Sequence, residues 1–307
     1  MVPDHVLVIG FGGPTKPEEV RPFIEEVARG FNIPEARLKE VERHYEAIGG
    51  RSPYNELTFK LVSQLEESLK QNRFRVPVFV GMRNWHPFLK ETISEIKERG
   101  LKKGVGVILA PHRSEVSFER YLKNVEEARR AVGAEEIEYE YLPSWHAHPL
   151  FIQAQAEFVG KIYDPLTAEE KGSTHLLFTA HSIPVAMAEK SRYVEEIKES
   201  SSLVVRALQV SHWGVAYQSR SGSPREPWLG PDLLTVIREL KQKTVLLVPI
   251  GFLCDNAEVL YDLDIEAKEA AGKSGVRYLR APTVTGHPKF TALLTELIGE
   301  LLVAGGG

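Results

Sequence analysis

The chain of 307 residues contains a single cysteine, Cys254. One thiol excludes an intrachain disulfide, a zinc–thiolate cluster and a four-cysteine iron–sulfur site within one chain. The sequence also lacks an apolar run of the roughly 18–20 residues that cross a membrane. Its N-terminus has neither the basic segment nor the cleavage site of a secretory signal. These absences predict a cytoplasmic protein without a transmembrane segment.

Positive charge is not in excess either, because 38 Lys and Arg residues face 42 Asp and Glu residues for a net charge of −4. The composition therefore gives no support to a nucleic-acid or anionic-membrane partner. Low-complexity segments and long linkers are absent too. With 43% hydrophobic residues the chain can bury a large core, and its length corresponds to one or two domains.

Short apolar runs alternate with amphipathic stretches, which is the pattern of an α/β protein with parallel sheets. Four strand-like runs in each half predict two doubly wound domains, over residues 1–145 and 146–307, with a helical insertion after the first strand. We expect strands near His5–Phe11, Val76–Met82, Gly104–Ala110, Glu136–Tyr141, Thr174–His181, His212–Gln218, Thr244–Ile250 and Val276–Ala281. We expect helices near Pro17–Arg29, Glu35–Ala47, Pro53–Gln71 and His287–Val303.

Three carboxylates recur every fourth residue after the apolar run Thr244–Ile250. They are Glu258, Asp262 and Glu266, on a helix predicted to begin at about Asn256, a good N-cap residue. The opposite side is expected to be filled by Val259, Leu260, Leu263 and Ala267. No Lys or Arg lies between Asn256 and Ala267, although exposed faces usually mix both signs. The row is either a solvated acidic face or a path for a cation.

A histidine ends another predicted strand of the same sheet. His181 follows the run Leu176–Ala180, and Pro184 stands where a helix begins. Because parallel strands end at one edge of a sheet, His181 is expected near the Glu258 helix. A neutral imidazole facing a carboxylate can take up protons near neutral pH or ligate a transition metal.

Other stretches carry weaker signals. The segment Pro111–Ser114 follows a strand of the first half, where it forms either a cleft wall or a helix-capping turn. The segment Gly10–Pro14 lacks both the G-x-G-x-x-G pattern and the lysine of a phosphate-binding loop, which argues against a dinucleotide-dependent enzyme.

Taken together, several stretches resemble the ferrochelatases. They are His44-Tyr45-Glu46-Ala47-Ile48-Gly49-Gly50-Arg51-Ser52-Pro53, Thr179-Ala180-His181-Ser182-Ile183-Pro184, Gln218-Ser219 followed by Pro227-Trp228-Leu229-Gly230-Pro231, and Val248–Phe252 running into Glu258–Glu266. They occur in the family's order and span essentially the whole chain. The resemblance implies a lyase-class metal chelatase of haem biosynthesis, with two Rossmann-like halves and the porphyrin in the cleft between them.

The resemblance also implies roles for single residues. His181 and Glu258 correspond to the catalytic pair that handles the metal at the macrocycle, and Asp262 and Glu266 to an acidic row that can hold a second cation such as Mg²⁺. In the family this helix contains a π-type stretch, which would align residues that an ideal α-helix spreads over about 80°. The porphyrin-binding positions are Phe11, Arg29, His44, Tyr45, Ser52, Arg83, Tyr121, Ser219 and Trp228.

Two positions depart from the family. Phe11 stands where some bacterial members have a tyrosine that can ligate product iron, and Asn84 stands where some have a histidine. Axial ligation at Phe11 and metal entry at Asn84 are therefore in doubt. The proton acceptor also stays open, because His181 can either accept pyrrole protons or briefly ligate iron.

The substrates implied are ferrous iron and a porphyrin, and no permanently bound cofactor is expected. Compact members without a cysteine-rich extension or an apolar lip metallate coproporphyrin III, which we favour over protoporphyrin IX. We expect a monomer that passes its product to a transient haem-accepting protein. The alternatives are a cobalt or nickel chelatase of the same architecture and, outside the enzymes, a two-lobed protein that binds a metal or a tetrapyrrole.

Overall fold

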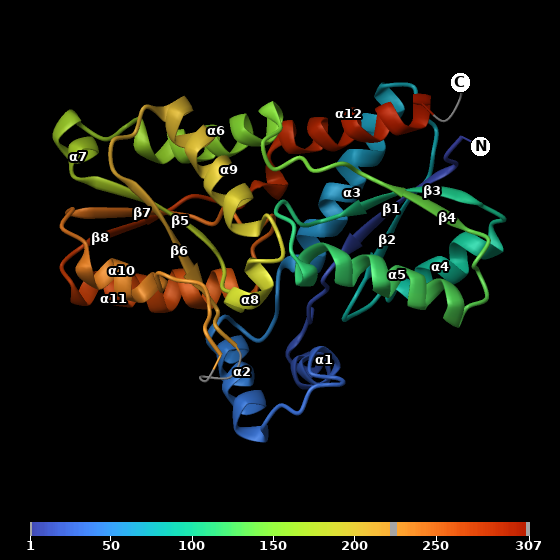
Figure 1. Cartoon of the computed structure of the whole chain (residues 1–307), viewed down its shortest axis with the longest axis horizontal. Helices are drawn as coiled ribbons and strands as arrows, with labels where there is room; N and C mark the ends of the chain where they lie inside the picture. Colours follow the sequence, from blue (N-terminus) through green and yellow to red (C-terminus); the bar gives the residue numbers. More distant parts are fainter. Residues whose placement is uncertain (1, 222–225, 305–307) are drawn as a thin grey trace. The chain divides into compact units, whose positions relative to one another are not determined.

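The computed structural model describes residues 2–221 and 226–304 and contains two compact units (Figure 1). Unit 1 comprises Met1–Leu109, Val116–Pro143 and Phe290–Gly307, and unit 2 comprises Ala110–Glu115 and Ser144–Lys289. This division departs from the predicted domains, 1–145 and 146–307, in two places. A short segment of the first half belongs to unit 2, and the last helix belongs to unit 1. The position of a helix in the sequence does not determine which sheet it packs on.

The sheet of unit 1 is parallel, with the strand order β2-β1-β3-β4. Every residue of the central strand β1 is buried, since helices cover both faces of the sheet. The four strands agree with the predicted ones to within a few residues at each end. Their bounds are β1 His5–Gly10, β2 Val78–Met82, β3 Lys103–Ile108 and β4 Glu138–Tyr141.

Helices α3 and α12 lie on one face of this sheet, and α4 and α5 lie on the other (Figure 1). Helix α12 packs beside α3: the Thr295 hydroxyl donates to Ser68 Oγ at 2.8 Å, and Gly299 lies against the Phe74 ring. The predicted insertion after β1 contributes α1, α2 and α3. The bounds are α1 Val20–Val27, α2 Glu35–Ala47, α3 Tyr54–Gln71, α4 Leu89–Glu98, α5 Arg120–Ala131 and α12 Pro288–Ala304, with a short 3₁₀-helix η1 Pro17–Glu19 and a short π-helix η2 Glu115–Glu119.

Unit 2 repeats this plan with the strand order β6-β5-β7-β8, again parallel. Helices α6 and α9 lie on one face, and α10, α11 and the π-helix η3 lie on the other (Figure 1). The strands are β5 Thr174–His181, β6 Trp213–Gln218, β7 Thr244–Val248 and β8 Arg277–Arg280. The helices are α6 Pro149–Tyr163, α7 Ala168–Gly172, α8 Val185–Ala188, α9 Tyr193–Leu208, α10 Leu233–Glu239, η3 Val259–Ala267, α11 Lys268–Lys273 and η4 Val284–Gly286.

The carboxyl edge of this second sheet positions the chemically interesting residues. His181 ends β5, and its partner in register on β6 is Gln218, which ends that strand. Strand β7 continues through Pro249 and Gly251 into the segment that begins the π-helix. Gly251 lies so close to Ala180 that a Cβ atom would approach the Ala180 Cβ to 2.7 Å, so only glycine lets the chain leave β7 beside β5.

Candidate active site

His181 and Glu258 face each other at this edge. Their closest atoms, His181 Nδ1 and Glu258 Oε2, lie 3.0 Å apart, and the two side chains are 30% and 44% exposed. From α9, the Tyr193 hydroxyl donates to the backbone carbonyl of His181 at 3.0 Å and fixes the end of the strand. The histidine is therefore held by its own backbone while its ring stays within reach of solvent or a ligand.

The Glu258 carboxylate determines which ring nitrogen of His181 can react. An ionised carboxylate only accepts hydrogen bonds, so Nδ1 carries the proton and Nε2 keeps the lone pair. Burial by itself lowers the pKa of His181, but the charge and hydrogen bond of Glu258 and the charge of Asp262 outweigh it and raise the pKa above its usual value. The ring thus favours taking up a proton.

The acidic helix is a π-helix over Val259–Ala267, as the family resemblance implied. It begins where predicted, with the Asn256 side-chain oxygen accepting from the Val259 backbone N–H at 2.9 Å. Its buried side is a single line of Val259, Leu263 and Ala267, each fully buried. Leu260, which was also expected on the side away from the carboxylates, is half-buried.

Asp262, the middle member of the row, is held from strand β6. Ser219 Oγ donates to Asp262 Oδ2, and the Gln218 amide Nε2 lies 3.4 Å from that oxygen and 3.4 Å from the Glu258 backbone carbonyl. Burial, followed by the charges of Glu258 and Glu266, raises the pKa of Asp262 to about 7. Its proton can therefore come and go near neutral pH.

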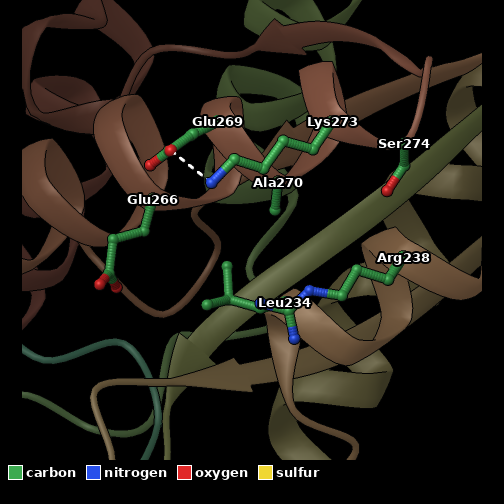
Figure 2. Close-up of a pocket in the computed structure, with 7 residues that line it drawn as sticks. All are labelled: Leu234, Arg238, Glu266, Glu269, Ala270, Lys273 and Ser274. Carbon is green, nitrogen blue, oxygen red and sulfur yellow. Dashed lines mark ion pairs between the residues drawn. The ribbon is translucent and has the colours of Figure 1, made fainter.

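Glu266 stands at the end of the row and lines a pocket of about 300 Å³ between α10 and α11 (Figure 2). Within the pocket, Lys273 Nζ forms an ion pair with Glu269 Oε1 at 2.6 Å. Its walls therefore carry both signs of charge beside the last carboxylate of the row. The lining residues are Leu234, Arg238, Glu266, Glu269, Ala270, Lys273 and Ser274.

The loop after β6 brings Trp228 next to the strand end that carries His181. Trp228 pairs with Pro184 through an isolated antiparallel bridge, and the Leu229 N–H donates to the Ile183 carbonyl at 2.9 Å. The indole is half-buried, and its N–H has no hydrogen-bond partner in the part of the chain that the structure describes. Trp228 is thus an aromatic ring anchored beside Pro184, three residues after His181.

In unit 1, Arg83 lies beside two other predicted porphyrin-binding residues, Phe11 and Tyr121. Its guanidinium carbon lies 5.9 Å from the centre of the Phe11 ring and 5.8 Å from that of Tyr121. Burial lowers the pKa of Arg83. Within residues 2–221 and 226–304 this half-buried cation forms no ion pair, and the carboxylate whose charge acts on it, Glu127, is only a minor influence on its pKa. Phe23 contacts the rings of both Phe11 and Tyr45 and completes the group.

The remaining predicted positions of unit 1 are more scattered. Arg29 is 76% exposed and pairs with Glu26. His44 is half-buried, and burial is the main cause of its lowered pKa. Ser52 is 5% exposed and its hydroxyl accepts from the Tyr54 N–H at 3.3 Å. The structure therefore does not join Arg29 or Ser52 to the Arg83 group.

Two residues outside the predicted set also have clear places. Asn84 is buried, and its side-chain amide donates to the Phe11 carbonyl at 3.2 Å. It therefore supports the backbone that follows strand β1. His112 is 1% exposed in unit 2, 3.0 Å from Ser200 Oγ, and burial lowers its pKa to about 3. Between the two readings of the segment Pro111–Ser114, this burial favours the structural turn.

Sequence reasoning missed Gln218 and Arg280 as parts of the site. Gln218 could have been found, because it immediately precedes Ser219 and ends the strand beside β5. Arg280 had no such signal, since only the pairing of β7 with β8 brings it to the π-helix. Arg280 contacts both Asp255 and Asp264.

Solved structures identify the class of fold. The chain superposes on SirB from Bacillus subtilis with Fe³⁺ at a TM-score of 0.61 and 11% identity, covering 99% of this chain and 98% of that one. It also matches the sirohydrochlorin chelatase SirB from Bacillus subtilis subspecies spizizenii in complex with cobalt, at a TM-score of 0.59 and 10% identity, covering 98% and 95%. At such identities the likeness establishes the fold, which is that of a class II chelatase.

Sequence comparisons identify the family. The ferrochelatase family profile matches residues 4–302. A ferrochelatase of Rhodopirellula baltica is 37% identical over 303 residues, covering 97% of this chain and 86% of that one. A coproporphyrin III ferrochelatase of Mycobacteroides abscessus is 37% identical over 308 residues, covering 98% and 89%. The chain belongs to the ferrochelatase family.

This membership makes the chain a lyase-class metal chelatase of haem biosynthesis, with a porphyrin and Fe²⁺ as its substrates. The predicted family, fold class and enzyme class are confirmed. None of the helices described by the structure has the length and apolar character needed to span a bilayer.

Proposed function

We propose that this ferrochelatase inserts Fe²⁺ into coproporphyrin III to give coproheme, with His181 and Glu258 as its catalytic pair. The observation that carries the site is the 3.0 Å contact between these residues at the start of the aligned acidic row. Coproporphyrin III is favoured because several full-length relatives at 34–37% identity bear that substrate in their names. Protoporphyrin IX is the alternative substrate.

The reaction is an exchange of protons for a metal ion. A free porphyrin carries two pyrrole N–H groups, and forming the four iron–nitrogen bonds releases two protons. An enzyme accelerates this exchange by accepting those protons where they leave and by bringing the metal to one face of the ring. The site must therefore combine a base with a supply of ligands for the incoming cation.

His181 suits the base. Its Nε2 atom carries the lone pair while Nδ1–H is held by Glu258, whose charge raises the pKa of His181 and so stabilises the imidazolium that forms when Nε2 accepts a pyrrole proton. We therefore assign His181 the role of proton acceptor rather than iron ligand. Asp262, with a pKa of about 7, is positioned to receive a proton next.

Asp262 and Glu266 are proposed to pass cations toward the pair or to hold a second divalent ion such as Mg²⁺. Among the described residues no three His, Cys, Asp or Glu side chains converge as a ready metal-binding group. Carboxylates that are spaced along a helix, instead of gathered at one point, suit an ion that moves along them better than an ion that stays bound. Mg²⁺, which keeps several of its waters, needs only one or two carboxylates.

The unit 1 group around Arg83 is proposed to contact the porphyrin. The half-buried ring of Phe11 offers flat apolar surface, the rings of Tyr45 and Tyr121 are buried in the same group, and Arg83 is a half-buried cation that a propionate would neutralise. Arg29, His44, Ser52, Ser219 and Trp228 complete the proposed set of contacts. A transient protein that accepts the product is also part of the proposal.

Anaerobic insertion assays with two variants and two porphyrins test the proposal. Wild-type enzyme and His181→Ala receive Fe²⁺ with either coproporphyrin III or protoporphyrin IX under matched solubilisation, and product formation is followed by absorption. We expect kcat/KM to be higher for coproporphyrin III. With both porphyrins, His181→Ala should lose about 10²–10⁴-fold in rate, the range of a positioned general base.

A His148→Ala variant serves as control, because His148 caps α6 by accepting from the Leu150 N–H at 3.3 Å. Near-normal insertion by His181→Ala would refute the catalytic assignment. A higher kcat/KM for protoporphyrin IX in the wild type would refute the substrate assignment and leave the catalytic one standing.

A further inference from the structure

Arg280, the last residue of β8, connects the turn before the acidic row to the middle of the π-helix that carries it. Its Nε and Nη2 donate to the two carboxylate oxygens of Asp264 at 2.7 and 2.8 Å. Its Nη1 and Nη2 contact the two oxygens of Asp255 at 3.2 Å each, and Nη1 also donates to the Ala281 carbonyl at 3.3 Å. All five N–H donors of the guanidinium are therefore occupied.

Two neighbours of Arg280 strengthen this clamp. The Tyr278 hydroxyl donates to the Leu263 backbone carbonyl at 2.7 Å and lies 3.2 Å from Asp264 Oδ1. The Thr283 hydroxyl donates to Asp255 Oδ1 at 2.9 Å. Strand β8 and the loop after it thus hold both the turn before the π-helix and the middle of the π-helix.

The clamp divides five nearby carboxylates into two kinds. Asp255 and Asp264 are 24% and 33% exposed and are neutralised by an Arg280 that is itself only 15% exposed. With its five donors used, Arg280 has none left for Glu258, Asp262 or Glu266. Arg280 therefore does not neutralise the row, although it pairs with carboxylates of the same segment.

We propose that Arg280 is a positioning residue for metal delivery, which holds the π-helix in the register that aligns Glu258, Asp262 and Glu266. Asp264 lies between Asp262 and Glu266 in the sequence, so a rotation of the helix at Asp264 would displace both. The inference rests on the proposed role of the row. It assigns Arg280 no contact with iron or porphyrin.

The geometry of the clamp is specific to arginine. A guanidinium is a planar fork that can serve two carboxylates at once, whereas the lysine ammonium is a point charge with three donors. Lysine at this position would keep the charge and could pair with Asp255 or Asp264, but not replace the two-sided contact. Arg280→Lys therefore separates a role in charge balance from a role in alignment.

Steady-state kinetics of three variants test the proposal: Arg280→Met, Arg280→Lys and the control Arg277→Met. Arg277 lies on the same strand but pairs with Glu170 at the surface, where its side chain is 53% exposed. Initial rates of anaerobic insertion are measured against Fe²⁺ and, separately, against porphyrin, and porphyrin binding is measured by fluorescence. Thermal unfolding of each variant is recorded in parallel.

We expect Arg280→Met and Arg280→Lys to raise the KM for Fe²⁺ about tenfold, because misplaced groups lose productive geometry. Porphyrin affinity should stay within about twofold, and Arg277→Met should change neither quantity. If Arg280→Met does not fold, Asp264→Asn replaces it, with the same rise in the KM for Fe²⁺ expected.

An unchanged KM for Fe²⁺ in folded Arg280 variants overturns the inference, and so does an equal loss of porphyrin affinity. If either result is obtained while His181→Ala is inactive, only the proposed role of Arg280 is rejected. Full activity of His181→Ala would instead reject the proposed function on which the clamp depends.

Discussion

Ser219 adopts a backbone φ of +60°, a conformation more common for glycine or asparagine. From this position its hydroxyl donates to Asp262, whereas the family resemblance predicted a contact with the porphyrin. The first places Ser219 beside the proposed path of the cation, and the second places it against the porphyrin. In the described structure the side chain acts on the acidic row, and a porphyrin contact by Ser219 stays a prediction.

Replacing Ser219 by alanine distinguishes these readings. The hydrogen bond from Ser219 lowers the pKa of Asp262, so its loss should raise that pKa further. If an ionised Asp262 passes the cation, the acidic limb of kcat/KM for Fe²⁺ should move to higher pH by up to about one unit, the worth of one hydrogen bond. Anaerobic insertion rates across pH 6–9 (about the range in which Asp262 titrates) measure the shift.

Ser182→Ala is the matched control, because the Ser182 hydroxyl donates to the Leu229 carbonyl at 2.9 Å and not to the row. We expect its pH profile to match the wild type. A rise in the KM for porphyrin with an unmoved pH profile in Ser219→Ala would favour the porphyrin contact instead.

At the scale of one element, the π-helix η3 carries one aspartate that stabilises the fold through an ion pair and another that destabilises it when ionised. Asp264 is paired with Arg280, whereas Asp262 is half-buried beside Glu258 and Glu266 and has a pKa of about 7. A carboxyl whose pKa is raised in the folded state stabilises the fold when protonated. That contribution is lost as the pH rises from about 4, the pKa in the unfolded chain, to about 7.

Asp262→Asn should therefore stabilise the metal-free protein at pH 8, by about 1–3 kcal/mol in the free energy of unfolding. The gain should vanish near pH 4, where both forms are uncharged. Asp264→Asn should do the opposite at pH 8 and destabilise, because Arg280 loses a partner. Urea unfolding in the presence of a chelator, at pH 4 and at pH 8, measures the free energy of unfolding of the wild type and of both variants.

Equal destabilisation by the two substitutions would show that Asp262 is not strained by its neighbours. A gain for Asp262→Asn that persists at pH 4 would assign the effect to packing rather than to charge.

Sequence patterns predicted the regular elements of this chain well. Apolar runs located the eight strands of the described part of the chain, and helix α2 was predicted at its observed bounds, Glu35–Ala47. Periodicity could not predict the π-helix, since Glu258, Asp262 and Glu266 fit an α-helical spacing equally well. Only the family resemblance indicated it.

The site was predictable to the extent that it lies at strand ends. His181 and Glu258 follow neighbouring strands of one sheet, so pattern and topology alone placed them together. Arg280 was beyond reach, because the sequence does not reveal that β8 pairs with β7 or that its last side chain turns toward the π-helix. Contacts between distant segments depend on register, which local patterns do not fix.

At the scale of the whole molecule, the assignment of α12 to unit 1 is testable through a pair of helical glycines. A Cβ atom on Gly299 of α12 would lie 2.8 Å from the Phe74 ring, too close without movement, whereas a Cβ on Gly272 of α11 meets nothing within 4 Å. Gly299→Ala should destabilise by about 1–3 kcal/mol through overpacking. Gly272→Ala should stabilise by about 0.5–1 kcal/mol through helix propensity.

Hydrogen exchange locates these effects. Gly299→Ala should reduce amide protection in α3 and β2, both in unit 1, and Gly272→Ala should leave those elements unchanged. Reduced protection confined to β5–β8 in Gly299→Ala would contradict the assignment of α12. The predicted boundary at residue 145 did not anticipate this assignment, because an amphipathic pattern shows that a helix packs but not which sheet it packs on.

The order of the chain along the two units has a consequence for synthesis on the ribosome. Strands β1–β4 emerge first, yet α12, which covers one face of their sheet, is made only after all of unit 2. Apart from Ala110–Glu115, unit 2 is one continuous stretch. The nascent chain therefore completes unit 2 before unit 1, and the sheet that is translated earliest waits longest with the part of its apolar face that α12 covers still open, the state in which chaperones engage a growing protein.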